Sequence, residues 1–352
     1  MSGAPSYELR AYRPGDEEAF LPLLRASLGE TTAAPQSRAF WSWKHLENPF
    51  GRSYGIFAWD GSAQRALALR ALMRWRFVDP EGRRVEAVRA VDTATDPSCR
   101  RMGLFSSLTR RAVDELARGG TGFIFNTPNA ASLPGYLKLG WQLVATWPLH
   151  ARLLRPLRLI AALPALRRGC GSSLPPWREL FGREALSWRE FRERFGAAVA
   201  EVVDAGERAR RRRGLRTERT IGYLDWRYGE HPGVTYAAVP LVRGGALAGF
   251  AVLRPNVRFG LREAVLAELV QREADPSLAH ELLAAVGRAV RTDYVVALFP
   301  GGSPELVALR RARYLRVPRR GITFTVRPLA TGAWDPRRAD AWDLSAGDLE
   351  VF

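Results

Sequence analysis

The segment from Val88 to Trp141 constrains the fold of this 352-residue chain more than any other part of it. Residues 87–95 are apolar and partly β-branched, which predicts a strand that ends at an Asp-Pro pair. A short basic turn with a glycine follows at residues 100–103. From Leu104 onward, apolar residues recur at three-to-four spacing and predict an amphipathic helix. Strand, turn and helix in this order indicate an α/β fold.

The turn at residues 100–103 predicts an anion-binding site at the start of the helix. The first N–H groups of a helix have no partners inside it, and they point outward from its end. Gly103 allows the backbone to approach a ligand closely, while Arg100 and Arg101 add positive charge. The expected ligand is a di- or polyphosphate. A basic glycine turn before a helix is also an ordinary connection, so the turn alone is not specific.

A second strand and a second, shorter helix are predicted after the amphipathic helix. Residues 122–125 form the strand, and Ser132 opens the helix. Asn129 lies between the two elements, and Tyr136 lies on the helix. The polar residues therefore follow the second strand in the same way that the basic turn follows the first.

The order and spacing of these residues resemble the acyl-CoA core of the GNAT superfamily of N-acetyltransferases. The resemblance consists of Arg100-x-x-Gly103 after a strand, Asn129 and Tyr136 seven residues apart, and the pair Gly140-Trp141. In that superfamily the loop has the pattern Arg/Gln-x-x-Gly-x-Gly/Ala and holds the pyrophosphate of CoA. This chain departs from the pattern at Phe105, where the family has glycine or alanine, although Ser106 and Ser107 offer hydroxyls nearby.

The resemblance also implies roles for individual residues. Tyr136 would protonate the leaving thiolate, and Asn129 would contact the pantetheine arm or the reacting groups. Backbone N–H groups at residues 93–95 would hold the pantetheine and polarise the thioester carbonyl. The base for the amine is open between Glu86 and Asp92, since C-terminal carboxylates would reach the site only if the tail folds back. The residues expected to contact acyl-CoA are Thr93, Ala94, Thr95, Arg100, Arg101, Met102, Gly103, Leu104, Phe105, Ser106 and Asn129.

An internal repeat predicts two copies of one fold. Residues 40–54 match residues 223–236, and Trp43 matches Trp226 at an offset of 183 positions. Predicted strands and helices then follow the second segment in an order like that of the first. Two tandem units are the simplest explanation of this pattern.

The second copy is expected to lack the acyl-CoA chemistry. Residues 271–276 contain no Arg-x-x-Gly turn, and Leu309 stands where Tyr136 stands in the first copy. We therefore expect this copy to form a wall of the acceptor site. The predicted fold is α/β, a mixed α+β sheet in two tandem GNAT-like domains of which the second is degenerate. The arrangement resembles the first two domains of the Eis-like acetyltransferases without their third, sterol-carrier-like domain.

The predicted domain organisation has four parts. These are residues 1–155 (GNAT domain with the acyl-CoA site), 156–176 (connector), 177–328 (second GNAT-like domain) and 329–352 (acidic C-terminal tail). The tail is expected either to dock on the basic body of the protein or to remain solvated. A basic run at residues 208–213 predicts either a mobile surface loop or a phosphate-binding patch.

The net charge of +17 favours anionic partners such as CoA, nucleic acid or an acidic membrane surface. Two cysteines give no disulfide framework, and the four histidines lack metal-ligand spacing, so no metal is expected. The sequence has no signal peptide and no apolar run of about 20 residues, the length that spans a bilayer. These features predict a cytoplasmic protein without a transmembrane segment.

The expected function is acyl-CoA-dependent N-acyl transfer, with acetyl-CoA as co-substrate and direct attack by an amine acceptor in a ternary complex. One alternative is an aminoacyl-tRNA-dependent transferase like the Fem enzymes, which also contain tandem GNAT-like units; the arginine excess suits RNA. Against it, the residues for CoA are in place in this chain. The other alternative is a non-catalytic CoA-binding protein, which Phe105 leaves open. The acceptor, the length of the acyl chain and the oligomeric state are not predicted.

Overall fold

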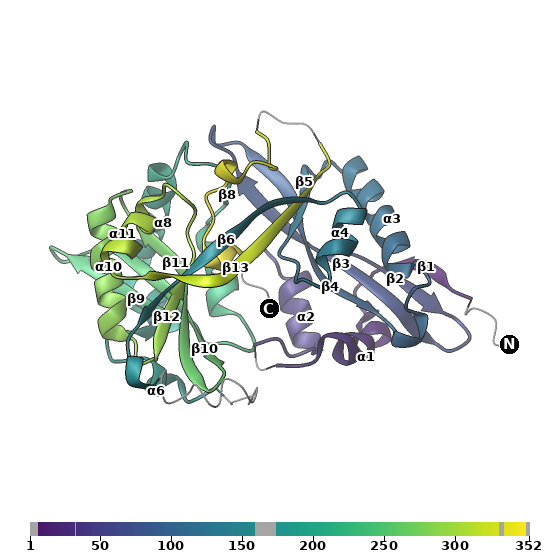
Figure 1. Ribbon diagram of the computed structural model, residues 1–352, viewed down its shortest axis with the longest axis horizontal. Helices are drawn as coiled ribbons and strands as arrows, with labels where there is room; N and C mark the ends of the chain where they lie inside the picture. Colours follow the sequence, from purple (N-terminus) through teal and green to yellow (C-terminus); the bar gives the residue numbers. More distant parts are fainter. Residues whose placement is uncertain (1–5, 32, 159–173, 331–333, 350–352) are drawn as a thin grey trace.

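The computed structural model describes residues 6–31, 33–158, 174–330 and 334–349. Its centre is a mixed sheet that runs through both halves of the described chain (Figure 1). The strands are β1 (Glu8–Ala11), β2 (Tyr54–Asp60), β3 (Arg65–Val78), β4 (Arg84–Thr95), β5 (Phe123–Asn126), β6 (Gln142–Leu153), β7 (Leu186–Ser187), β8 (Arg216–Thr217), β9 (Ala237–Arg243), β10 (Ala246–Arg258), β11 (Leu261–Gln271), β12 (Tyr294–Ala297) and β13 (Leu315–Pro328). They lie in the order β1-β2-β3-β4-β5-β13-β6-β12-β11-β10-β9-β7, and β8 pairs with β3 outside this path.

Helices cover both faces of the sheet. They are α1 (Glu17–Leu28), α2 (Arg38–His45), η1 (Pro97–Cys99), α3 (Leu104–Arg118), α4 (Leu133–Lys138), α6 (Trp177–Leu180), α7 (Trp188–Phe195), α8 (Ala197–Ala209), α9 (Ile221–Leu224), the π-helical turn η2 (Asp225–Gly229), α10 (Pro276–Ala289), α11 (Pro304–Arg311), η3 (Ala339–Ala341) and α12 (Ala346–Leu349). In the first half, α1 and α2 lie on one face and α3 and α4 on the other (Figure 1). In the second half, α8 and α10 pack on opposite faces.

Strand β3 shows how the first half is built between two helical layers. Leu69 packs against Phe20 of α1, whereas Leu72, which points to the other face, belongs to the core under α3. A strand that is buried on both faces reads as a nearly continuous apolar run rather than as a strict alternation. Residues 66–73 form such a run, and Arg70 is the only charged residue in it.

The two halves exchange strands in the middle of the sheet. β13, the last strand of the described chain, lies between β5 and β6 and is antiparallel to both. β6, which comes from the first half, pairs in turn with β12 of the second half. Each half therefore completes the sheet of the other, and the sheet is continuous across the predicted domain boundary. Most of the predicted connector, residues 159–173, lies outside the described residues.

The two copies of the internal repeat meet in the interior of the molecule. Trp43 of α2 stacks on Trp226 of η2, with ring centroids 5.0 Å apart. Each indole N–H donates to the backbone carbonyl of the other tryptophan, at 2.9 Å and 2.8 Å. Reciprocal contacts between equivalent residues are what an approximate twofold axis produces. The two partners are 183 residues apart, which is the offset that the sequence repeat predicted.

The acidic tail docks over its described residues, 334–349. Trp342 is only 2% exposed and packs edge-on against Phe77 and Phe123. Nη1 of Arg89 donates to the carbonyl of Asp348 at 3.0 Å, so the tail also reaches the central strands. Of the two expectations for this segment, docking is therefore the one that the structure supports.

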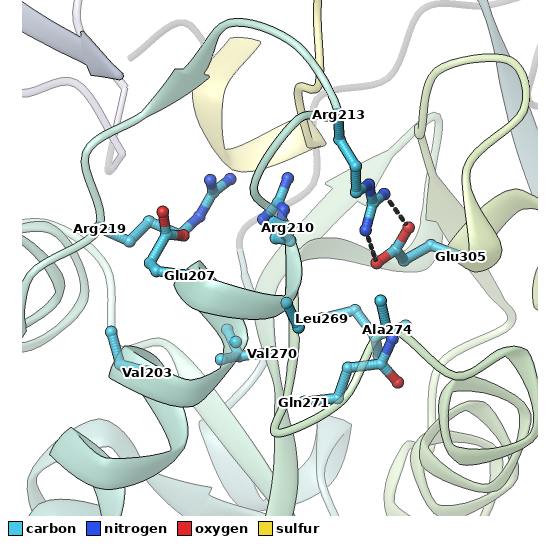
Figure 2. Close-up of a pocket in the computed structure, with 12 residues that line it drawn as sticks. Val203, Glu207, Arg210, Arg213, Arg219, Leu269, Val270, Gln271, Ala274 and Glu305 are labelled. Atoms are coloured by element: carbon cyan, nitrogen blue, oxygen red, sulfur yellow. Dashed lines mark hydrogen bonds and ion pairs between the residues drawn. The ribbon is translucent and has the colours of Figure 1, made fainter. Parts of the chain in front are cut away.

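The basic run at residues 208–213 takes part in this docking. Nε of Arg210 donates to Oδ2 of Asp343 at 2.9 Å, and Nη2 of Arg213 lies 2.6 Å from Oε2 of Glu305. Figure 2 shows these arginines beside a small cavity, with Arg213 paired to Glu305. Because carboxylates neutralise both side chains, neither of them offers a free charge to a phosphate.

The predicted fold class is confirmed, and the strands and helices expected on either side of the basic turn correspond to β4, β5, α3 and α4. Two features were not predicted: helices α7 and α8, and the insertion of β13 between two strands of the first half. Within the described ranges, no helix is long and apolar enough to cross a membrane.

Candidate functional site

The basic turn at residues 100–103 leads directly into an open helix end. Gly103 is the N-cap residue of α3 and has a φ of 76°, a left-handed conformation that glycine adopts without strain. The N–H of Ser107 makes the first bond inside the helix, to the carbonyl of Gly103 at 2.9 Å. The N–H groups of residues 104–106 are therefore left without partners inside the helix.

The surroundings of this helix end suit an anion. No side chain caps the helix, and no acidic residue lies in its first turn. Arg100, Arg101 and Gly103 are exposed. Unpaired N–H groups, the positive end of the helix dipole and two arginines together attract a group with several negatively charged oxygens, such as a phosphate.

Strand β4 loses one neighbour close to this turn. β4 and β5 pair in parallel from Ala87 to Arg89, and no described strand continues beside β4 on that edge. A β-bulge follows at Asp92, which has a φ of 31° and lies opposite no residue of β3. Residues 93–95 still pair with β3, so only the edge that faces away from β3 keeps backbone groups without a strand partner.

Tyr136 of α4 lies close to this part of β4. Its hydroxyl oxygen accepts a hydrogen bond from Nη1 of Arg70 at 2.8 Å. The same nitrogen donates to the hydroxyl of Thr93 at 2.6 Å. The ring of Phe105, in the first turn of α3, meets the Tyr136 ring edge-on at a centroid distance of 5.7 Å. Side chains from β3, β4, α3 and α4 thus converge on one phenol.

Two of the predicted site residues lie apart from this convergence. Asn129 is exposed, and its Oδ1 accepts from the N–H of Ser132 at 2.9 Å, which stabilises the turn before α4. Glu86 lies toward the end of β4 that is far from the basic turn, and it accepts from Nε of Arg76 at 2.7 Å. Both side chains are engaged within their own neighbourhoods.

Asp92 forms a buried cluster with two residues of α2. Its Oδ2 lies 2.7 Å from Nζ of Lys44 and 2.7 Å from Nε2 of His45, whose Nδ1 is 2.8 Å from the hydroxyl of Ser53. Burial alone would raise the pKa of Asp92, but the charge of Lys44 and the hydrogen bond from His45 hold this pKa well below its usual range. Burial lowers the pKa of His45, so its imidazole is neutral and donates its Nε2 proton to Asp92.

Three residues of this region were not predicted as site residues: Arg70, Lys44 and His45. For Lys44 and His45 the available signal was their place beside Trp43 in the repeated segment. For Arg70 it was a single charge inside an apolar strand. Within the described part of the chain, no group of three or more His, Cys, Asp or Glu residues is arranged to hold a metal ion.

Comparison with known proteins connects the first half of the chain to one family. Residues 8–144 match the family model described as an acetyltransferase (GNAT) domain. This range contains the basic turn, the bulge of β4 and Tyr136. No curated protein sequence matches the chain.

Solved structures extend the likeness to both halves at the level of the fold. A GCN5-related N-acetyltransferase from Anabaena variabilis has 12% identity and a TM-score of 0.59, with 92% of this chain and 73% of that chain covered. The N-myristoyltransferase of Saccharomyces cerevisiae, solved with bound myristoyl-CoA, has 13% identity and a TM-score of 0.57, with 96% and 88% covered. Eis1 from Mycobacterium abscessus has 14% identity and a TM-score of 0.53, with 92% and 74% covered.

Proposed function

We propose that this chain, whose residues 8–144 match the model of the GNAT acetyltransferase domain, is an acyltransferase that transfers an acyl group from acyl-CoA to an amine. Acetyl-CoA is the proposed donor, and the amine attacks the thioester directly while both substrates are bound. Holding the two reactants together supplies most of the rate enhancement in such a mechanism.

The observation that carries the proposal is the uncapped start of α3. Gly103 brings the backbone close to the ligand, and Arg100 and Arg101 are exposed beside three N–H groups without intrahelical partners. The CoA pyrophosphate would lie there. The pantetheine arm would then follow the open edge of β4, where residues 93–95 face no β5 neighbour and can bind it through their backbone groups.

Tyr136 is the proposed acid. Its phenol lies beside Thr93, next to the edge of β4 along which the pantetheine would run. As the carbon–sulfur bond breaks, the sulfur keeps the electron pair and takes the phenolic proton. Asn129 is proposed to contact the same arm with the amide nitrogen that the turn before α4 does not use.

The two candidate bases, Glu86 and Asp92, differ in what they can do. Asp92 remains ionised next to Lys44 and His45, and a carboxylate with a depressed pKa is a weak base. We propose instead that Asp92 stabilises the bulge of β4, next to the strand edge along which the pantetheine arm would lie. Glu86 is paired with Arg76 toward the far end of β4. The amine would therefore lose its proton to solvent rather than to either carboxylate.

Isothermal titration with acetyl-CoA, followed by a screen of amine acceptors that records release of free thiol, tests the proposal. We expect binding to the wild-type chain, weaker binding to the Arg100→Ala/Arg101→Ala variant, and thiol release with at least one amine. Arg110→Ala is the matched control, because Arg110 is an exposed arginine of α3 away from its start. Absence of acetyl-CoA binding would contradict the proposal, and binding without thiol release for any amine would reduce the chain to a CoA-binding protein. Strongly salt-dependent tRNA binding in place of acetyl-CoA binding would favour a Fem-like transferase.

A further inference from the structure

Arg70 is a buried cation without a carboxylate partner among the described residues. Its side chain has no solvent exposure, and within the described ranges only Thr93 and Tyr136 accept hydrogen bonds from it. Nε and Nη2 are both buried without a hydrogen-bond partner. By contrast, the equally buried Arg219 lies within 3.1 Å of two carboxylates. Burial of an uncompensated charge is costly, so the position of Arg70 calls for an anion that the free protein does not supply.

The surrounding contacts fix the direction of the hydrogen bonds. Nη1 of Arg70 donates to the oxygen of Tyr136, so that oxygen acts as an acceptor. Thr93 accepts from the same nitrogen and uses its own proton on the carbonyl of Val91, at 3.1 Å. No described residue accepts the phenolic proton of Tyr136, which therefore remains available to a ligand.

Aromatic rings partly compensate the buried charge. The guanidinium carbon of Arg70 lies 5.1 Å from the centroid of the Tyr136 ring and 5.5 Å from that of Phe105. This contact gives a physical reason for a phenylalanine in the first turn of α3, at the position where the family pattern has a small residue. Phe105 shields the guanidinium, so the charge acts on Tyr136 and is not screened by water.

We propose that Arg70 is a positioning residue that directs the proton of Tyr136 toward the sulfur of CoA and stabilises the negative charge that then forms on the phenol. The idea rests on the proposed function. When the carbon–sulfur bond breaks, the sulfur takes the electron pair and the Tyr136 proton. The phenolate left behind is held by Nη1 of Arg70 until it regains a proton from the ammonium of the acceptor or from water. In the complex with CoA, the sulfur and the phenol together hold one proton after the other is lost, and Arg70 stabilises the single negative charge that they share.

The second half of the chain has neither an arginine at the position of Arg70 nor a tyrosine at the position of Tyr136. Arg70 lies opposite Thr93, one pair before the bulge of β4, and Val252 lies opposite Glu268, one pair before the corresponding bulge of β11. Val252 therefore occupies the place of Arg70, just as Leu309 occupies that of Tyr136. An apolar pair replaces the charged donor and the phenol where no acyl-CoA chemistry is expected.

Binding of CoA and of desulfo-CoA, measured by isothermal titration across the titration range of the thiol, tests the proposal without requiring an acceptor. Desulfo-CoA carries the same phosphates but no sulfur. We expect the wild type to prefer CoA, increasingly so as the pH rises. In Arg70→Met the ratio of affinities for CoA and desulfo-CoA should be roughly tenfold smaller, which is the effect expected of a hydrogen bond to a charged group. Arg70→Lys should retain part of this ratio. Thermal unfolding of Arg70→Met should occur at no lower temperature, because an apolar side chain of similar size replaces an unpaired charge.

Turnover gives the second readout. If Arg70 acts through Tyr136, the Arg70→Met/Tyr136→Phe double variant should be no slower than Tyr136→Phe alone. Additive losses, or an Arg70→Met variant that keeps the pH-dependent preference for CoA, would overturn the proposal while leaving acyl transfer intact. A wild-type chain that binds neither CoA nor desulfo-CoA would overturn the proposed function and the role of Arg70 with it.

Discussion

The two halves of the chain share the same arrangement of strands and helices and differ in how one helix of each half begins. In the first half, Gly103 begins α3 and leaves its N–H groups uncapped. In the second half, the corresponding α10 begins after Asp275, whose carboxylate accepts from the N–H groups of Ser277 and Leu278. A helix end that is already capped by its own carboxylate repels a phosphate. Under the proposed function, a few side chains at a helix start would therefore distinguish the half that binds acyl-CoA from the half that does not.

The β-bulges of β4 and β11 also share their backbone geometry and differ in their side chains. β4 and β11 each carry one extra residue at matching places, Asp92 and Ala267. The backbone distortion persists in both halves, whereas the carboxylate that pairs with Lys44 and His45 is present only in the first. The backbone geometry of the bulge is therefore common to both halves, whereas the charged cluster is a feature of the candidate site alone.

The largest effect that should separate the halves concerns their tyrosines. Tyr136→Phe should lower kcat by roughly a hundredfold or more with little change in the KM for acetyl-CoA, because a general acid acts in the transition state. Tyr314→Phe is the control, since Tyr314 is a buried tyrosine of the second half in the core with α11. Steady-state kinetics with any accepted amine measures both. Full turnover by Tyr136→Phe would show that the phenol is not the acid.

A stability difference should separate the bulge of β4, at Asp92, from the other end of the same strand, at Glu86. Asp92→Asn should lower the free energy of unfolding by about 3 kcal/mol, because it removes one member of a buried ion pair while asparagine still tolerates the positive φ. Chemical denaturation at neutral pH measures this loss. Glu86→Gln, in a partly exposed pair with Arg76, should cost less than about 1 kcal/mol. Equal losses for the two variants would mean that the cluster of Asp92, Lys44 and His45 contributes no more to the free energy of unfolding than a partly exposed ion pair does.

A smaller effect should come from adding a carboxylate near the start of α3, where the second half has Asp275 at the start of α10. Ser106→Asp places a carboxylate in the first turn of α3 and should weaken acetyl-CoA binding by roughly tenfold, through repulsion of the phosphates. Ser277→Asp, in the first turn of α10, should leave binding unchanged. Titration calorimetry at low ionic strength compares the two, and the difference should shrink as salt is added. Equal affinities of the two variants for acetyl-CoA would show that acyl-CoA does not bind at the start of α3.

The smallest effect concerns acid stability, to which each half contributes a buried histidine. Burial, together with the nearby Arg227 and Arg254, lowers the pKa of His231 to about 3, and burial lowers that of His45. A histidine whose pKa is depressed by folding binds its proton in the unfolded chain first, so stability falls as the pH drops below about 6.5. From pH 6.5 to 5.5, His231 should remove about 1 kcal/mol from the free energy of unfolding, and His45 should contribute in the same direction.

His231→Phe isolates one of these two contributions. The phenylalanine ring would remain among Phe40, Trp43 and Tyr236, but the variant should lose the part of this dependence on pH that His231 supplies. Denaturant titrations at several pH values provide the measurement. An unchanged slope would mean that His231 is protonated equally in the folded and unfolded chain.

Local pattern explains what the sequence could predict. The strands and helices around the basic turn follow from apolar spacing over short stretches, and the repeat predicted that Trp43 and Trp226 occupy equivalent positions. That the two side chains contact each other was not predicted. The position of β13 between β5 and β6 depends on contacts between residues nearly 200 positions apart, which no local pattern encodes. The same reason applies to Arg70, since a charged residue in an apolar strand does not reveal which side chains surround it.

The central claim is that one half of the chain binds acyl-CoA and the other supports it. The stoichiometry of acetyl-CoA binding, measured by isothermal titration of the full chain, tests this claim most directly. We predict a single acetyl-CoA per chain, with affinity that falls in the Arg100→Ala/Arg101→Ala variant. Two sites per chain, or a single site that is indifferent to this substitution, would contradict it.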